Sequence, residues 1–120
     1  MANILIVDDS PVVRNFHMNI LKMEGFTVDG AGDGLEALEK GLIQDYDLIL
    51  CDINMANMDG LTFLKKYRVE IKETPVIIIS TELEEIHKKK AYELGANLYL
   101  VKPVKPEDLK LHIKMILGME

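Results

Sequence analysis

The sequence predicts one α/β domain built on a parallel β-sheet that helices cover on both faces. Four short apolar runs of strand length are distributed along the chain, and each run is continuous rather than alternating. Continuous runs are typical of strands that are buried on both faces, as in parallel sheets. The segments between the runs have the apolar spacing and the end residues of helices. Strand and helix therefore alternate five times, which favours an open, doubly wound sheet.

Five segments are expected to form the strands. Four of them are runs of aliphatic and β-branched residues, whereas Phe26-Thr27-Val28 alternates in character and is expected at a sheet edge. In chain order the expected strands are 4–7, 26–28, 48–51, 76–79 and 98–101. The connections are short, and no linker, repeat or low-complexity stretch interrupts the pattern. We therefore expect residues 1–120 to form a single domain.

The segments after the strands begin and end like helices. A capping side chain, or a proline at the first helical position, marks the start of four of them. These start signals are Ser10-Pro11, Asp33 with Glu36, Thr81 with Glu84, and Pro106-Glu107-Asp108. Gly25 and Gly95 are expected to end the first and fourth helices. The expected apolar faces consist of Val13, Phe16, Ile20 and Met23; Leu35, Leu38 and Leu42; Leu61, Leu64 and Tyr67; and Leu109, Ile113, Ile116 and Leu117.

Charge and cysteine content argue against several classes of protein. The chain has 14 Lys and Arg against 20 Asp and Glu, which gives a net charge of -6. An acidic domain is unsuited to a phosphate backbone, so we expect no direct nucleic-acid partner. The single cysteine, Cys51, cannot form an internal disulfide, which favours a reducing compartment. No apolar run approaches the ~20 residues that span a bilayer, and we expect a cytoplasmic monomer without membrane insertion.

Reactive polar residues follow four of the five expected strands. Asp8 and Asp9 follow the first strand, Asp52 the third, Ser80 the fourth and Lys102 the fifth. Each of these alone is more often a turn, cap or surface residue than a functional one. In a doubly wound sheet, however, the carboxyl ends of the strands meet at one edge, and ligands bind there. The combination therefore predicts a single site.

Carboxylates, a hydroxyl and an ammonium in one place favour phosphoryl transfer. Three carboxylates within a few ångströms repel one another and would not all stay ionised unaided. A divalent cation relieves this repulsion, and hard oxygen ligands select Mg²⁺. One carboxylate is then left as a nucleophile toward phosphorus, while Lys102 and the Ser80 hydroxyl can contact phosphoryl oxygens. The residues thus predict Mg²⁺-dependent phosphoryl transfer to an aspartate.

With these residues in these places, the whole chain resembles the receiver domains of bacterial two-component response regulators. The stretch Asp52-Ile53-Asn54-Met55-Ala56-Asn57-Met58-Asp59-Gly60 is especially similar to that of chemotaxis regulators. The resemblance implies a flavodoxin-like (βα)5 fold with strand order 2-1-3-4-5. It also implies a stand-alone switch that takes phosphate from a sensor histidine kinase or a phosphotransfer protein. Its output would then be phosphorylation-dependent binding to an unknown downstream target protein.

The resemblance also implies the metal ligands and the nucleophile. Asp52 matches the phosphoacceptor, so the chain would be a signalling module that promotes only its own phosphorylation and dephosphorylation. Asp9 and Asp52 match the direct carboxylate ligands of Mg²⁺. Asn54 would add its backbone carbonyl, and Asp8 would act largely through water.

A second group of residues matches the switch. Lys102 and Ser80 match the pair that senses the phosphoryl group, and Tyr99 matches the aromatic residue that turns inward when the hydroxyl is drawn to phosphate. Asn54 and Glu82 lie two residues beyond Asp52 and Ser80, where they would flank the phosphoryl group. Both are polar and of modest bulk, so we expect them to admit or orient water and to give a short-lived aspartyl-phosphate.

Other functions share parts of this pattern. A phosphatase of the haloacid dehalogenase type also forms an aspartyl-phosphate, but Asn54 stands where its second aspartate belongs, and there is no room for a substrate cap. A flavodoxin-like cofactor carrier would not place Asp8 and Asp9 beside a phosphate. A phosphorelay intermediate, a phosphate sink and a degenerate receiver that serves only as an interaction module are alternatives within the family.

Several conspicuous residues are expected to have no chemical role. The glycine-rich stretch 30–34 does not match a nucleotide-binding loop and is expected to be a turn into the second helix. His17, His87 and His112 are scattered along the chain and are expected at or near the surface. Cys51 lies in a buried strand and is expected to be an inert core thiol.

Overall fold

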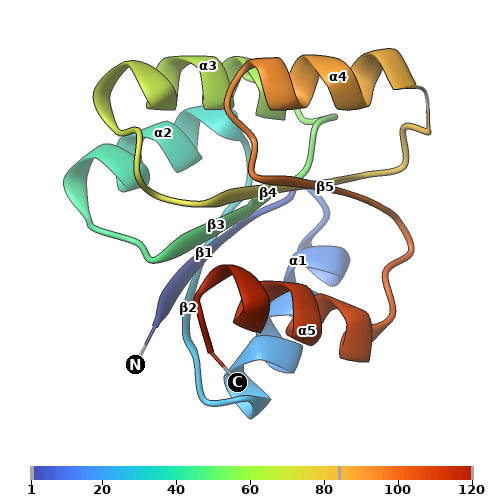
Figure 1. The fold of residues 1–120 in the computed structure, drawn as a ribbon. Helices are drawn as coiled ribbons and strands as arrows, with labels where there is room; N and C mark the ends of the chain where they lie inside the picture. Colours follow the sequence, from blue (N-terminus) through green and yellow to red (C-terminus); the bar gives the residue numbers. More distant parts are fainter. Residues whose placement is uncertain (1, 84, 120) are drawn as a thin grey trace.

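Five parallel strands form one sheet in the computed structural model, which describes residues 2–83 and 85–119. In chain order the strands are β1 (Asn3–Val7), β2 (Thr27–Ala31), β3 (Leu48–Cys51), β4 (Val76–Ser80) and β5 (Leu98–Val101). Their order across the sheet is β2-β1-β3-β4-β5, and each neighbouring pair is parallel (Figure 1). The predicted fold class and strand order are confirmed. The edge strand β2 starts one residue later than expected and leaves Phe26 buried just before it.

A helix follows each strand, and the helices form two layers. They are α1 (Pro11–Met23), α2 (Gly34–Ile43), α3 (Gly60–Glu70), α4 (Glu85–Glu93) and α5 (Pro106–Ile116). Helices α1 and α5 lie on one face of the sheet, and α2, α3 and α4 lie on the other (Figure 1). Among residues 2–83 and 85–119, none of these helices has the length and apolar character needed to cross a membrane.

Alternate strand residues build a separate core on each face. In β1, Leu5 and Val7 pack into the core under α2, α3 and α4, whereas Ile4 and Ile6 pack into the core under α1 and α5. The other strands alternate in the same way, because successive side chains of a strand point to opposite faces. Burial on both faces therefore explains why the strand sequences are continuous apolar runs.

The helix caps mostly agree with the sequence. The Ser10 hydroxyl accepts a hydrogen bond from the Val13 amide at 3.3 Å, and Asp33 accepts one from the Glu36 amide at 2.8 Å. The Glu36 carboxylate accepts from the Gly32 amide, one residue before the cap, so the capping box closes one position earlier than usual. Helix α4 begins at Glu85, and the expected box of Thr81 with Glu84 involves a residue outside the described part of the chain.

Helices α1 and α2 bury a different face from the one that their apolar residues predict. In α1 the buried residues are His17 and Leu21, whereas Phe16 and Met23, which we expected inside, are exposed. The prediction considered apolar residues only. In the structure α1 is rotated so that the imidazole of His17 occupies an interior position. Helix α5 buries Leu109 as predicted.

Helix α2 faces the interior with its smallest residues. Gly34, Ala37 and Gly41 are buried, whereas Leu35 and Leu42 of the predicted face are each 46% exposed. The cause is close packing against α3 and the loop before it: a Cβ atom on Gly41 would lie 3.0 Å from the ring of Tyr67 in α3, and one on Gly34 would lie 2.5 Å from the carbonyl oxygen of Met58 in the loop. A larger residue at Gly41 would force the two helices apart, and one at Gly34 would displace the loop before α3. Leu38 still packs against the core.

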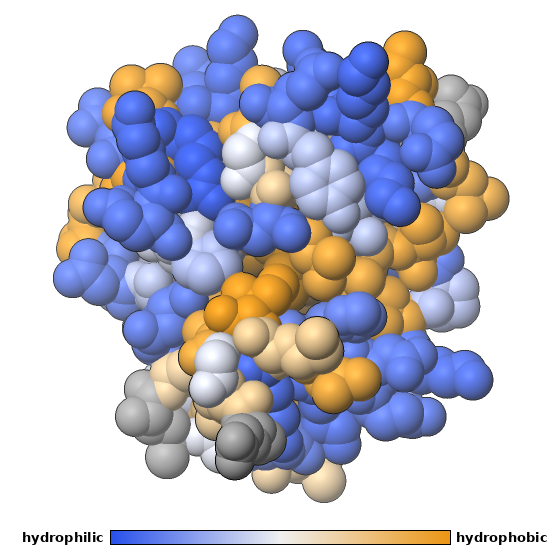
Figure 2. Space-filling view, viewed as in Figure 1, coloured by the Kyte–Doolittle hydropathy of each residue, from blue (hydrophilic) through white to orange (hydrophobic). Residues whose placement is uncertain are grey.

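The surface is hydrophilic over much of the side shown in Figure 2. Hydrophilic side chains predominate over α3 and α4, and a band of hydrophobic ones lies between these helices and α5. Leu111 and Met115 of α5 are among the exposed apolar residues of the molecule. Exposed apolar residues of this kind are ordinary for a folded domain and do not by themselves define a function.

Gly60 is predicted to tolerate no side chain. It is the first residue of α3, and a Cβ atom there would lie 1.9 Å from the carbonyl oxygen of Asp52, which is backbone and cannot turn away. Gly60→Ala should therefore lower the free energy of unfolding by about 2 kcal/mol or more, as forced overpacking does. Urea unfolding measures this effect. Gly32→Ala is the matched control, because its Cβ would meet only ordinary contacts from 3.6 Å outward. Equal losses in both variants would contradict the prediction.

Candidate functional site

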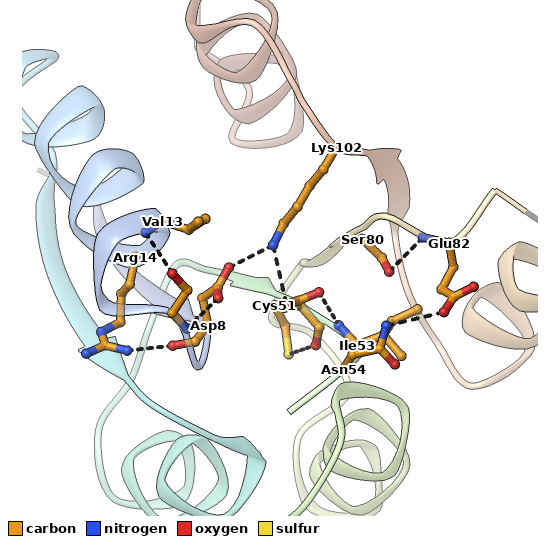
Figure 3. A network of polar contacts seen from close by, with 11 residues as sticks. Asp8, Val13, Arg14, Cys51, Ile53, Asn54, Ser80, Glu82 and Lys102 are labelled. Carbon is orange, nitrogen blue, oxygen red and sulfur yellow. Dashed lines mark hydrogen bonds and ion pairs between the residues drawn. The ribbon is translucent and has the colours of Figure 1, made fainter. Parts of the chain in front are cut away.

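The carboxyl ends of four strands bring the predicted site residues together. Asp8 and Asp52 are the residues directly after β1 and β3, Ser80 is the last residue of β4, and Lys102 follows β5. The sheet pairing continues into these positions: the Asp52 amide donates to the carbonyl of Val7 at 3.0 Å, and the Lys102 amide donates to the carbonyl of Ser80 at 2.8 Å. The side chains therefore start from fixed backbone and converge at one edge (Figure 3).

Three carboxylates form the centre of the site. Asp8, Asp9 and Asp52 each offer a carboxylate oxygen, and these oxygens lie within 4.8 Å of one another. Asp8 and Asp52 are buried, whereas Asp9 is exposed at the rim. A set of oxygen donors around an open side fits a hard divalent cation such as Mg²⁺, which binds a few carboxylates and retains several waters. The predicted acidic cluster is confirmed.

Lys102 offsets part of the repulsion between these carboxylates. Its ammonium nitrogen lies 2.9 Å from Oδ2 of Asp8 and 3.3 Å from Oδ2 of Asp52. Burial by itself lowers the pKa of Lys102, but hydrogen bonding to Asp8 and the charge of Asp52 outweigh it, so the pKa is raised and the side chain stays charged. One ammonium among three carboxylates still leaves an excess of negative charge, which favours a cation at the open side.

Asp52 is held in an environment that disfavours its charged form. Burial is the main cause of its raised pKa, and the neighbouring carboxylate of Asp8 adds to it, whereas Lys102 and the backbone N–H of Ile53 act in the opposite direction. The Ile53 amide donates to Oδ1 at 2.8 Å, and Lys102 contacts Oδ2. Both carboxylate oxygens are therefore oriented, and a cation placed beside them would favour the ionised form.

Two donors to Asp8 were missed by the sequence analysis. The Ser10 amide donates to Oδ1 of Asp8 at 2.9 Å, and the Arg14 guanidinium donates to its backbone carbonyl at 2.5 Å. Ser10 was recognised only as a helix cap, and nothing in the spacing of Arg14 marks it as a neighbour of the site. The start of α1 thus fixes Asp8 by both side chain and main chain (Figure 3).

Glu82 connects the site with the loop after β4. Its amide donates to the buried Ser80 hydroxyl at 3.1 Å, and its carbonyl accepts a hydrogen bond from the Tyr99 hydroxyl at 2.8 Å. Its carboxylate accepts from the side-chain amide of Asn54 at 3.3 Å. Tyr99 is buried, and burial raises the pKa of its phenol. The structure thus brings Asn54, Ser80, Glu82 and Tyr99 into one hydrogen-bonded set.

His17 is buried beside the site, which corrects the expectation of a surface residue. Burial is the main cause of its lowered pKa, and the charge of Lys102 lowers it further. It lines an apolar pocket of ≈ 280 Å³ between α1 and the segment after β5, together with residues that include Phe16, Lys102 and Val104. Cys51 is fully buried and burial raises the pKa of its thiol, so it is unreactive.

Comparison with known proteins gives the family. The model of the response regulator receiver domain matches residues 4–114. The chain is 38% identical over 116 residues to the transcriptional regulatory protein ResD of Bacillus subtilis, covering 97% of this chain and 48% of that protein. It is 36% identical over 114 residues to the sensor protein EvgS of Escherichia coli, covering 95% of this chain and 10% of that protein. The chain therefore spans about half or less of the length of these relatives.

Solved structures show the same fold over nearly the whole chain. The chemotaxis protein CheY4 of Vibrio cholerae has 36% sequence identity and a TM-score of 0.92, with coverage of 97% of this chain and 98% of that one. A CheY-like receiver domain from Methanospirillum hungatei has 30% identity and a TM-score of 0.95, with coverage of 98% and 94%.

The chain belongs to the response regulator receiver domain family. It is a phosphoacceptor signalling module of two-component systems rather than a true enzyme, and modules of this class partner with histidine kinases. Family membership overturns the haloacid dehalogenase alternative. The acidic triad of Asp8, Asp9 and Asp52 is typical of the Mg²⁺-binding site of receiver domains.

Replacing Asp52 by Asn is predicted to stabilise the protein in EDTA. Because the pKa of Asp52 is raised on folding, its contribution to stability is complete at low pH and is lost as the pH rises through the folded-state value. At pH 7 the ionised carboxylate therefore costs stability, and Asp52→Asn should raise the free energy of unfolding by about 1 kcal/mol.

Urea unfolding at pH 7 and pH 4 measures this effect, and the gain should shrink toward pH 4. Asp45→Asn, an exposed aspartate outside the site, is the control and should change stability little. A loss of stability in Asp52→Asn at pH 7 would contradict the electrostatic account.

Proposed function

We propose that residues 1–120 act as a single receiver unit that takes a phosphoryl group onto Asp52 from a phosphohistidine of a sensor histidine kinase or a phosphotransfer protein. The observation that supports this most is the Lys102 ammonium, which lies within 3.3 Å of both Asp8 and Asp52 inside the acidic triad. An oxygen of Asp52 forms the bond to phosphorus, and the nitrogen–phosphorus bond breaks with its electron pair going to the imidazole. Lys102 then offsets charge on the transferring group.

Each side chain of the site has a place in this step. Asp9 and Asp52 would bind Mg²⁺ directly, the backbone carbonyl of Asn54 would complete the ligands from the protein, and Asp8 would act through water. The bound ion supplies positive charge that neutralises the phosphoryl oxygens. Asp8 is tied to Ser10 and Lys102, and it helps to orient the ammonium rather than to attack phosphorus.

The hydrogen bonds around Glu82 suggest how phosphorylation changes the surface. The Ser80 hydroxyl accepts from the Glu82 amide, and the Tyr99 hydroxyl donates to the carbonyl of the same residue. If Ser80 turns toward a phosphoryl oxygen, the Glu82 amide loses its acceptor and the loop that binds Tyr99 moves. A downstream target protein that distinguishes the two arrangements would receive the signal.

The specific role proposed for the chain is that of a chemotaxis-like, cytoplasmic regulator that works as a monomer. The Asn54 and Glu82 pair supports a short-lived phosphoryl group, and the CheY4 structure matches over nearly its whole length. A phosphorelay intermediate or a phosphate sink is the second candidate, since the relatives ResD and EvgS are longer proteins that contain a similar segment. The lifetime of the aspartyl-phosphate separates these roles.

Covalent labelling tests the phosphoacceptor. Wild-type protein incubated with acetyl phosphate and Mg²⁺ should gain one phosphoryl group, whereas Asp52→Asn should fold and gain none, because it lacks the nucleophile. Intact-protein mass spectrometry measures the label, and Asp45→Asn is the control that should label normally. EDTA should also prevent labelling. Undiminished labelling of Asp52→Asn would contradict the assignment, and undiminished labelling in EDTA would contradict the role of the metal.

The lifetime of the phosphoryl group is predicted to be seconds to a few minutes in Mg²⁺. Basic or bulkier side chains at Asn54 and Glu82 should lengthen it, because they would hinder the water that approaches in line with the phosphorus. A tenfold change in rate corresponds to only ~1.4 kcal/mol in barrier, which one displaced water can account for. The decay of label after removal of the donor measures this in wild type, Asn54→Arg and Glu82→Arg. A wild-type lifetime of hours would contradict the chemotaxis-like role.

A further inference from the structure

His87 directs one nitrogen at the carboxylate of Glu82. It lies in the first turn of α4, and its Nδ1 is 3.6 Å from Oε2 of Glu82. The Nδ1 atom is buried and has no hydrogen-bond partner among residues 2–83 and 85–119. A buried polar atom without a partner is unfavourable unless a nearby group compensates for it. The Glu82 carboxylate is such a group, and a small approach would convert the contact into a hydrogen bond.

The two oxygens of Glu82 face different partners. Oε1 accepts from the Asn54 side chain at 3.3 Å, and Oε2 faces His87. The main chain of Glu82 is fixed separately, through Ser80 and Tyr99. The orientation of the carboxylate therefore depends on Asn54 and His87, and Figure 3 shows it turned toward Asn54.

We propose that His87 is a positioning residue that holds the Glu82 carboxylate against Asn54 and thereby sets the rate at which the aspartyl-phosphate is hydrolysed. The proposal rests on the proposed function, in which Asn54 and Glu82 flank the phosphoryl group. His87 itself lies on α4, and its ion-pair contact is with Glu82 and not with the triad or Lys102, so it acts through Glu82. The hydrogen on Nδ1, present in the imidazolium and in one neutral tautomer, is the group that makes the contact.

The size of the effect follows from the exposure of the pair. Both side chains are about one third exposed, at 37% for His87 and 35% for Glu82. A contact between partly exposed groups biases an orientation by a few-fold rather than by orders of magnitude. Removing the imidazole should leave the Glu82 side chain free to sample other rotamers, so that water near the phosphorus is oriented for a smaller fraction of the time. Hydrolysis should then slow by two- to fivefold.

The first test measures the position of Glu82 without any phosphorylation. In EDTA, the side-chain amide resonances of Asn54 should shift in His87→Ala, because the acceptor of their hydrogen bond moves. His87→Asn retains an N–H donor near the position of Nδ1 and should keep the wild-type resonances. His112→Ala removes a histidine of α5 and is the control for nonspecific effects. Asn54 resonances that are the same in His87→Ala as in wild type would overturn the proposal.

The second test measures the decay of phosphorylated protein in a double-mutant cycle. His87→Ala should slow the decay two- to fivefold in the wild-type background and have no effect in the Glu82→Ala background, and His87→Asn should decay like wild type. Equal slowing in both backgrounds, or no rescue by Asn, would overturn the proposal. A wild-type protein that takes no label would instead refute the proposed function, and the Asn54 resonances would then decide whether His87 positions Glu82.

Discussion

The site depends on one ammonium that lies between two buried carboxylates. Lys102 contacts both Asp8 and Asp52, which belong to the ends of different strands and would otherwise repel each other. The contact requires the ends of β1, β3 and β5 to lie at one edge of the sheet, which the strand order provides. The remaining excess of negative charge makes the site receptive to a divalent cation and to a phosphoryl group that the cation neutralises. The fold therefore brings like charges together at a local cost in stability, as proteins do at functional sites, and the proposed phosphoryl transfer would use these charges.

A second feature is that Glu82 connects the proposed phosphorylation site with the loop after β4. The main chain of Glu82 contacts Ser80 and Tyr99, and its carboxylate lies between Asn54 and His87. Binding of phosphate near Ser80 and movement at Tyr99 would thus share a single short loop between β4 and α4. The same side chain would influence water near the phosphorus. In the proposed mechanism, the lifetime of the signal and its transmission would therefore be coupled through local hydrogen bonds, which give a physical route for the coupling.

The backbone around Asp52 is packed so closely that it has little freedom to move. Gly60 approaches the backbone of Asp52 so closely that a single methyl group would displace it. On the far side of the loop, the small residues of α2 let α3 pack closely beside it. The backbone of Asp52, the proposed nucleophile, is therefore held by β1, through the carbonyl of Val7, and by the start of α3 at Gly60, which is the kind of support that a precisely oriented carboxylate requires.

The sequence by itself determined the strands and the residues that follow them, because burial on both faces demands continuous apolar runs and because strand ends must meet at one edge. Asp8, Asp9, Asp52 and Lys102 were located in this way, whereas the strand order came from resemblance to a family. The tertiary structure alone decided which helix faces are buried: His17 lies inside and Phe16 outside, and in α2 the glycines are buried whereas Leu35 and Leu42 are exposed. It also decided the contacts of Arg14, Glu82 and His87. These depend on the rotation and spacing of helices packed against distant segments, and local periodicity does not encode such geometry.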